Sequence, residues 1–221
     1  MESASFRGGG PVDDLSDALG HLKKAGCSVL VVGDLAGPVQ RLVSKRVMGE
    51  PGLDRVRILA TVGRLSGASE WFPGHVSTAS SDSHVIDLEG FDRGTASTST
   101  RKDAIRPDVT SDAVERFDVR LQAALEEHPD TKPEELRVVI APASYSSLSD
   151  ETIDEFIGSV NAVDGLTYLF LPGKQIWDLE TEWADRVDAL MDVRTDHLGT
   201  PEHRWVILDE RLESGWLPVQ P

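Results

Sequence analysis

Residues 28–34 have the sequence Ser28-Val29-Leu30-Val31-Val32-Gly33-Asp34. A short, continuous apolar run of this kind is typical of a strand that is buried on both faces, as in a parallel sheet. Apolar residues at helical spacing predict a helix on each side of it, over residues 12–25 and about 38–48. A helix, a buried strand and a second helix in this order favour an α/β fold.

The alternation continues along the rest of the chain. The elements expected next are strands at 55–62, 84–88, 136–140 and 166–171, and helices at 111–125, 149–163 and 177–190. Two final strands, at about 189–195 and 203–208, flank a loop with Gly199 and Pro201 and are expected to form a hairpin. We therefore predict a mostly parallel sheet with helices on both faces and a C-terminal antiparallel hairpin.

The length of 221 residues suits one domain or two small ones. Neither an internal repeat nor a linker is visible, so residues 11–221 are predicted to form a single domain. Residues 1–10 have no apolar stretch and are expected to be a disordered tail. Residues 63–110 are rich in Ser, Thr, Gly and Asp and are expected to be a weakly ordered insert.

The charge balance is strongly acidic. The chain has 22 Lys+Arg against 38 Asp+Glu, a net charge of −16, which argues against a general nucleic-acid binder because such proteins need a basic face. Of the basic residues 16 are Arg and only 6 are Lys, and an acidic, lysine-poor surface is typical of proteins from a salt-accumulating haloarchaeon. The longest apolar run, residues 29–32, is too short to span a membrane, and we expect a cytoplasmic protein.

Two other residue types suggest no chemistry. Cys27 is the single cysteine, and its place beside an apolar strand favours a buried thiol over a nucleophile. The six histidines show no close metal spacing. His197 and His203, with Asp196 and Glu202, could hold a metal, but a solvated hairpin loop is the favoured interpretation. We expect neither a metal nor a cofactor.

Ligands of an open parallel sheet bind beyond the carboxyl ends of its strands. The first such place follows residue 33, where a strand, a glycine-containing loop and a helix have the layout of a phosphate-binding loop, G-x-x-x-x-G-K-[ST]. Aligned from Gly33, the second glycine is Pro38, the lysine is Val39 and the Ser/Thr is Gln40. Asp34 adds a negative charge where phosphate would lie. The loop is therefore interpreted as vestigial, with Gly33, Asp34, Gly37 and Arg41 as its remaining candidate residues.

The second half of the phosphate machinery is missing as well. In phosphate-loop enzymes an apolar strand ends in an Asp that steadies magnesium, but the strand at 136–140 is followed by Ala141 and Pro142. The loss of both halves points to a non-catalytic descendant.

The order of elements resembles the haloarchaeal domains of unknown function that are related to the KaiC/RecA-like ATPases, in a form without the phosphate loop. The segments that carry this resemblance are residues 22–33, 135–140, 204–208 and 214–219. The resemblance implies a RecA-like fold. It carries over no catalytic residue, because the matching positions differ.

Three functions follow from these patterns. The first is a non-enzymatic regulatory or protein-interaction module, whose role in signalling is implied by the resemblance and whose partner is a protein or a second copy of the chain. Trp177, Trp216 and Trp71 are its candidate exposed aromatic residues. The second is a nucleotide-binding protein or weak ATPase that uses another basic residue, namely Arg41, Lys45 or Arg64. The third is an enzyme of another class that uses a polar residue at a strand end, namely Ser144, Tyr145 or Asp34.

Overall fold

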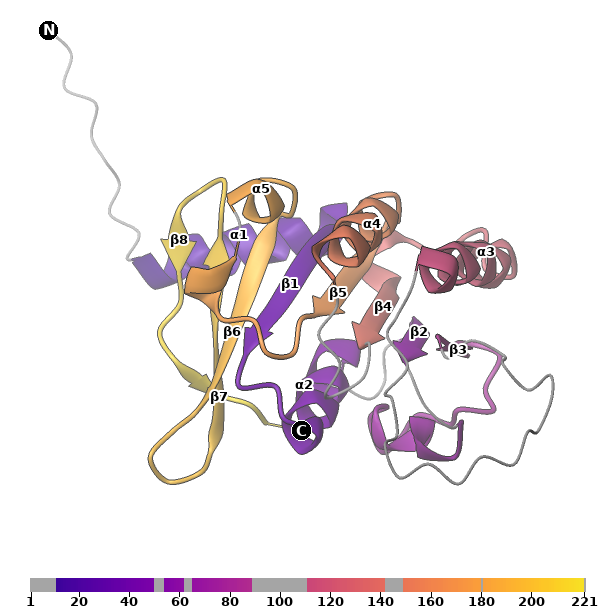
Figure 1. The fold of residues 1–221 in the computed structure, drawn as a ribbon, viewed down its shortest axis with the longest axis horizontal. Coiled ribbons are helices and arrows are strands. Elements are labelled where there is room, and N and C mark those ends of the chain that lie inside the picture. The colour runs from indigo at the N-terminus through magenta and orange to yellow at the C-terminus, as the bar shows by residue number, and fades with distance from the viewer. Residues whose placement is uncertain are drawn as a thin grey trace, which may run out of the picture.

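The computed structural model describes residues 11–49, 54–61, 65–88, 111–141, 149–179 and 181–220. Within these residues the chain builds one sheet of nine strands, ordered β3-β2-β4-β5-β1-β6-β7-β8, with β9 paired to β7 (Figure 1). The strands are β1 (Cys27–Gly33), β2 (Val56–Thr61), β3 (Ser83–Asp87), β4 (Leu136–Ala141), β5 (Leu166–Phe170), β6 (Ala189–Thr195), β7 (Pro201–Ile207), β8 (Leu212–Glu213) and β9 (Leu217–Pro218).

Strands β3 to β6 in this order are all mutually parallel, and β7 joins β6 in antiparallel pairing. Strand β1 lies between the parallel strands β5 and β6, and every one of its residues is buried, as its uninterrupted apolar sequence predicts. The mostly parallel sheet and the C-terminal hairpin are both confirmed.

Helices cover both faces of the sheet (Figure 1). They are α1 (Pro11–Ala25), α2 (Gly37–Met48), α3 (Ser111–Glu126), α4 (Asp150–Asn161) and the short α5 (Thr181–Ala184), with 3-10 turns η1 (Leu65–Glu70), η2 (Pro133–Glu135) and η3 (Ile176–Asp178). Alternate strand residues divide the core in two. Leu30 packs towards α3 and α4, whereas Val31 packs towards α2 and η1. Ser149 caps α4 as predicted, because its Oγ accepts a hydrogen bond from the Thr152 N–H. None of the helices in the described part of the chain is long and apolar enough to cross a membrane.

The C-terminal segment docks on the hairpin. Its two short strands were not predicted from the sequence. Strands β8 and β9 both pair with β7 in antiparallel fashion. The Val219 N–H donates to the Pro201 carbonyl, and the Val219 side chain is buried. The apolar end of the described chain therefore completes the edge of its own sheet.

The predicted helix at 177–190 is wrong. Only η3 and α5 form there, and β6 begins at Ala189. Ala189 and Leu190 are taken up by pairing with β1, and the Asp188 carboxylate accepts a hydrogen bond from the Ser28 N–H at 2.7 Å. The apolar spacing that suggested a helix reflects burial of an irregular segment, because Trp183 and Val187 pack into the core from it.

The strand predicted at 84–88 is confirmed as the edge strand β3. Residues 65–70 form η1, and Trp71 and Phe72 are buried against the α2 face of the sheet. The sequence did not predict η1 or this burial, because the few apolar residues of a Ser- and Gly-rich stretch are not periodic. Residues 62–64 and 89–110, like the predicted tail at 1–10, lie outside the described residues.

The carboxyl end of β1 is fixed by a close approach of two backbones. Gly33 has φ +101°, and a Cβ atom built on it would lie 2.0 Å from the carbonyl oxygen of Val193 in β6. A residue with a side chain would meet both an unfavourable backbone conformation and a clash with a buried strand. This position therefore requires glycine for sheet packing alone.

Gly33→Ala is expected to lower the free energy of unfolding by about 3 kcal/mol or more, because a strained backbone and a steric clash coincide. Gly158→Ala is the matched control, since Gly158 lies inside α4 and an added Cβ meets nothing within 4 Å. The control should raise stability by about 0.5–1 kcal/mol through helix propensity. Denaturant unfolding of both variants measures the difference, and a Gly33→Ala variant as stable as the parent would contradict the close approach.

Candidate functional site

The β1–α2 loop occupies the position of a phosphate-binding loop, at the carboxyl edge of the sheet. Three of its backbone N–H groups donate to carbonyls of the protein itself. The Gly33 N–H donates to the Lys174 carbonyl at 2.9 Å, the Asp34 N–H to the Val193 carbonyl at 2.7 Å and the Leu35 N–H to the Gly33 carbonyl at 2.8 Å. A phosphate-binding loop instead turns successive N–H groups towards the ligand. These three donors are unavailable to a phosphate.

Asp34 is held by β6 through its side chain as well. Its Oδ2 accepts a hydrogen bond from the Thr195 N–H at 3.1 Å. Together with the bond from the Asp34 N–H to Val193, this ties the loop to the hairpin. The carboxylate keeps a negative charge beside the start of α2, where it would repel an anion.

Gln40 fills the inside of the loop. Its side chain is fully buried, and its Nε2 donates to the Leu35 carbonyl at 2.9 Å. Gln40 stands where a phosphate-binding loop has the Ser or Thr that holds magnesium, so here the side chain braces the loop from within. Gly37 and Pro38 begin α2 directly after Ala36, and Pro38 brings no N–H to the helix start.

Arg41 is the basic residue nearest the loop, and it is engaged elsewhere. Its Nε lies 3.2 Å from the Glu70 carboxylate of η1, so the side chain links α2 to the 3-10 turn that packs beside it. The next candidate, Lys45, lies one turn further along α2. Arg64 lies outside the described residues.

The end of β4 has no carboxylate. Ala141 is fully buried, and its carbonyl accepts a hydrogen bond from the Thr61 hydroxyl at 3.1 Å, which ties β4 to β2. The chain beyond it, including Pro142, Ser144 and Tyr145, lies outside the described residues, so the third sequence-based function stays a prediction.

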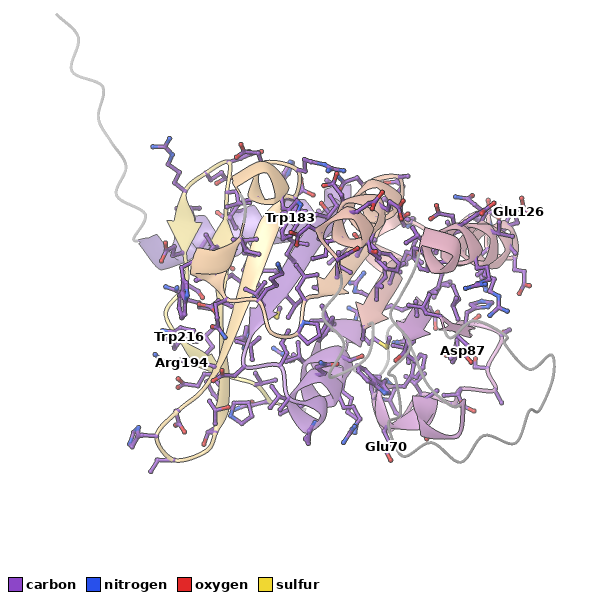
Figure 2. All side chains as sticks on the ribbon, in the orientation of Figure 1. Glu70, Asp87, Glu126, Trp183, Arg194 and Trp216 are labelled. Atoms are coloured by element: carbon purple, nitrogen blue, oxygen red, sulfur yellow. The ribbon has the colours of Figure 1, made fainter. Side chains whose placement is uncertain are left out.

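The candidate tryptophans have different environments. Trp177 in η3 is 77% exposed, whereas Trp71 is buried. Trp216 is half-buried, with the Arg194 guanidinium 3.9 Å and that of Arg204 5.0 Å from the ring centroid. Figure 2 shows Trp216 and Arg194 side by side at the hairpin. The Trp216 ring therefore helps to fix the C-terminal segment on the hairpin, and Trp177 is the one of the three that projects into solvent.

Cys27 is buried as predicted, and burial, followed by the nearby Asp188 charge, raises the pKa of its thiol to about 12. A thiol with that pKa is almost entirely protonated near neutral pH and is a poor nucleophile. The prediction of a structural cysteine is confirmed.

Residues 26–192 match the family of unknown function DUF7504. This chain belongs to the DUF7504 family. No curated protein matches its sequence.

Solved structures with a similar fold are known. The genome-packaging NTPase B204 of Sulfolobus turreted icosahedral virus 2, in complex with ATP-gammaS, aligns with a TM-score of 0.51 and 12% identity over 89% of this chain and 99% of that one. A KaiC-like protein from Pyrococcus horikoshii aligns with a TM-score of 0.50 and 14% identity, over 88% of this chain and 85% of that one. At these identities the likeness concerns the fold alone, and it confirms that this DUF7504 chain has the KaiC/RecA-like architecture.

A basic cavity lies near the amino ends of the strands, at the side of the sheet opposite the β1–α2 loop. The described residues around this cavity of about 310 Å³ include no Asp or Glu. Cationic residues at the ends of α1 and α2 and at the starts of strands face hydrophobic and aromatic side chains. The lining residues are Lys23, Arg46, Val47, Gly49, Arg55, Arg137, Leu166, Tyr168, Met191, His203 and Trp205. For a family member with a net charge of −16, this is a marked local reversal of sign.

Arg137 and His203 are the buried polar members of the basic cavity. Arg137 is 5% exposed, its Nη1 donates to the Leu136 carbonyl, and burial lowers the pKa of its guanidinium. His203 is 8% exposed and its Nδ1 has no hydrogen-bond partner among the described residues. Burial, then the charge of Arg46, lowers the pKa of His203, so it is neutral near pH 7.

Lys23 lies at the exposed rim of the basic cavity. Burial of part of its side chain, then the charges of Arg137, Arg46 and Arg55, lower the pKa of its ammonium. Like charges that depress one another's protonation are relieved by an anion placed between them. Lys23 and Arg137 therefore make the basic cavity a candidate site for an anionic group such as a phosphate.

Inorganic phosphate is expected to raise the melting temperature of the protein above that in chloride at equal ionic strength. At ten times Kd the rise should be about 3–6 °C, because a ligand that binds only the native state stabilises it by mass action. Arg137→Met should abolish the specific part of the rise. Arg116→Met, at an exposed position on α3, is the control and should keep it. A rise of equal size in both variants would show that phosphate acts only as a general stabilising salt.

Proposed function

We propose that this DUF7504 chain is a non-enzymatic regulatory or protein-interaction module built on a nucleotide-binding fold. The observation that carries the proposal is the closed β1–α2 loop, in which three N–H groups donate to carbonyls of the protein itself. The fully buried Gln40 side chain braces this loop from within. The fold is retained, while the loop that serves ATP in such folds is used for packing.

The exposed face of η3 supports the interaction part of the proposal. Trp177 is 77% exposed, and tryptophan is enriched at the energetic centres of protein interfaces. A second copy of this chain or another protein could cover it. A signalling role follows from the resemblance to KaiC-like proteins and is part of the same proposal.

The alternative function is ATP binding or weak ATPase activity through a non-standard loop. It is favoured by the fold of the two solved relatives. It requires that Arg41 leave Glu70, and that the loop release its internal hydrogen bonds before a phosphate can enter.

Calorimetric titration with ATP and magnesium distinguishes the two functions. The closed loop predicts no saturable heat at this site, because the N–H groups of Gly33, Asp34 and Leu35 already donate to protein carbonyls and are not free to repay the desolvation of a phosphate. The measurement is repeated on Arg41→Ala and on Arg137→Met, since the basic cavity could itself bind the triphosphate. Saturable binding that Arg41→Ala abolishes and Arg137→Met leaves intact would overturn the proposal.

The role of Trp177 in protein interaction is tested separately. Cross-linking and mass spectrometry in the native cell should recover a specific partner, or a second copy, with the parent chain and much less of it with Trp177→Ser. Val119→Ser is the matched control, because Val119 is an exposed apolar residue on α3. Equal recovery with both variants, or only monomer with the parent, would contradict a role for Trp177.

A further inference from the structure

Two histidines far apart in the sequence meet at the edge of the sheet. His84 lies on β3, and His128 follows the end of α3, 44 positions later. Their Nε2 atoms are 3.0 Å apart, and the two rings stand at 78° to each other with centroids 5.2 Å apart. The rings therefore point their nitrogen edges at one place. Figure 2 shows Glu126, the last residue of α3, at the same end of the molecule as Asp87 of β3.

Glu127 adds a carboxylate to the pair. One potential ligand atom from each of His84, Glu127 and His128 lies within 4.8 Å of the other two. The Ser81 carbonyl oxygen is a further neighbour, 3.1 Å from the His128 Nε2. The carboxylate and carbonyl oxygens accept hydrogen bonds, and two facing neutral imidazole nitrogens share at most one proton. One dication can bind both imidazoles and the Glu127 carboxylate together, whereas one proton shared between the rings gives that carboxylate no part.

The spacing of the two nitrogens fits a zinc ion. Zinc binds imidazole nitrogen at about 2.0–2.1 Å in tetrahedral geometry, which places two such nitrogens about 3.3 Å apart. The observed 3.0 Å requires only a small separation of the rings. Two imidazoles and one carboxylate are a ligand set that zinc uses in proteins when a fourth position stays open.

The surroundings of the three residues favour a cation. Glu127 and His128 face a cavity of about 380 Å³ whose other carboxylates are Asp54, Asp82, Asp130 and Glu135. Arg55 is the cationic residue of its lining. The carboxylates create a negative potential, and the open cavity leaves room for water at the fourth coordination position.

A hydrogen bond between the histidines is the simplest competing explanation. A proton on the His128 Nε2 can be shared between the His84 Nε2 and the Ser81 carbonyl. It gives no role to the Glu127 carboxylate that comes within reach of both rings. It also predicts no response to any metal, which makes the two explanations easy to separate.

We propose that His84, His128 and Glu127 form a binding site for a zinc-class transition-metal ion that fastens the end of α3 to the edge strand β3. The ligands come from segments that are brought together only by folding, so the metal binds the native state and stabilises it. Close spacing along the chain is the sequence signal of a metal site, and here only Glu127 and His128 are close in sequence. The site was therefore not predicted from the sequence.

The test is a titration of the metal-free protein with Co²⁺ and Zn²⁺. Cobalt should give the visible absorption of a four-coordinate site with nitrogen and oxygen ligands, at one ion per chain, and zinc should displace it. Zinc at a hundred times Kd should raise the melting temperature by about 5–10 °C. His84→Ala and His128→Ala should each weaken binding roughly 100-fold or more and remove the cobalt spectrum.

Two controls keep the result decisive. His197→Ala removes an exposed histidine at the tip of the hairpin and should leave both the spectrum and the shift unchanged. Calcium at the same concentration should give little shift, because a hard cation prefers an all-oxygen site. If calcium acts as strongly as zinc, or if the histidine variants keep the zinc response, the carboxylates of the cavity bind the ion and the proposal is wrong. An absent cobalt spectrum in the parent protein, whose folding circular dichroism verifies, also overturns it.

Discussion

The close contact between the end of β1 and β6 is the constraint on which the rest of the candidate site depends. Gly33 leaves no space for a side chain against the Val193 carbonyl, and Asp34 binds β6 through both its N–H and its carboxylate. The chain is therefore bonded to β6 at the point where it leaves the sheet. It enters α2 through Leu35 and Ala36, after the N–H groups of Gly33, Asp34 and Leu35 have each donated to a protein carbonyl. Gly33 is therefore a packing residue at the end of β1.

The carboxyl and amino ends of the strands differ in the charge of the side chains around them. At the carboxyl edge Asp34 adds a negative charge beside the β1–α2 loop, and the Arg41 side chain is paired with Glu70. At the amino edge, Lys23 and Arg46 stand in the last turns of α1 and α2, where cations are favoured by the helix dipoles. Arg137 adds a buried charge to the same cavity. The described cations that line a cavity therefore gather at the amino ends of the strands, away from the β1–α2 loop.

Sequence patterns predicted the fold well where burial and periodicity agree. The run from Val29 to Val32 predicted a strand of a parallel sheet buried on both faces, and β1 is that strand. The failed motif from Gly33 to Gln40 predicts a loop without phosphate chemistry, which stays a prediction. The segment at 177–190 misled because its apolar residues are buried although the chain there is helical only in the short elements η3 and α5. Strands β8 and β9, of two residues each, carry too little pattern to be recognised.

The tertiary clusters could not be predicted in the same way. His84 and His128 are joined only by the packing of α3 beside β3, and the basic cavity draws its residues from six separate segments. A partial signal existed in Arg137, a charged residue inside an otherwise apolar strand, since such a residue needs a reason to be buried. Without contacts across the sheet, that signal identifies neither the cavity nor its ligand.

Hydrogen exchange of the loop amides tests the closed loop most directly. The Asp34 N–H donates to the Val193 carbonyl at 2.7 Å, and the Gly33 N–H is bonded as well. The account predicts that both amides exchange slowly, like those of β1, and that ATP with magnesium leaves their rates unchanged. Fast exchange of these amides that slows when ATP and magnesium are added would contradict it, since the loop would then be open and would close on a nucleotide.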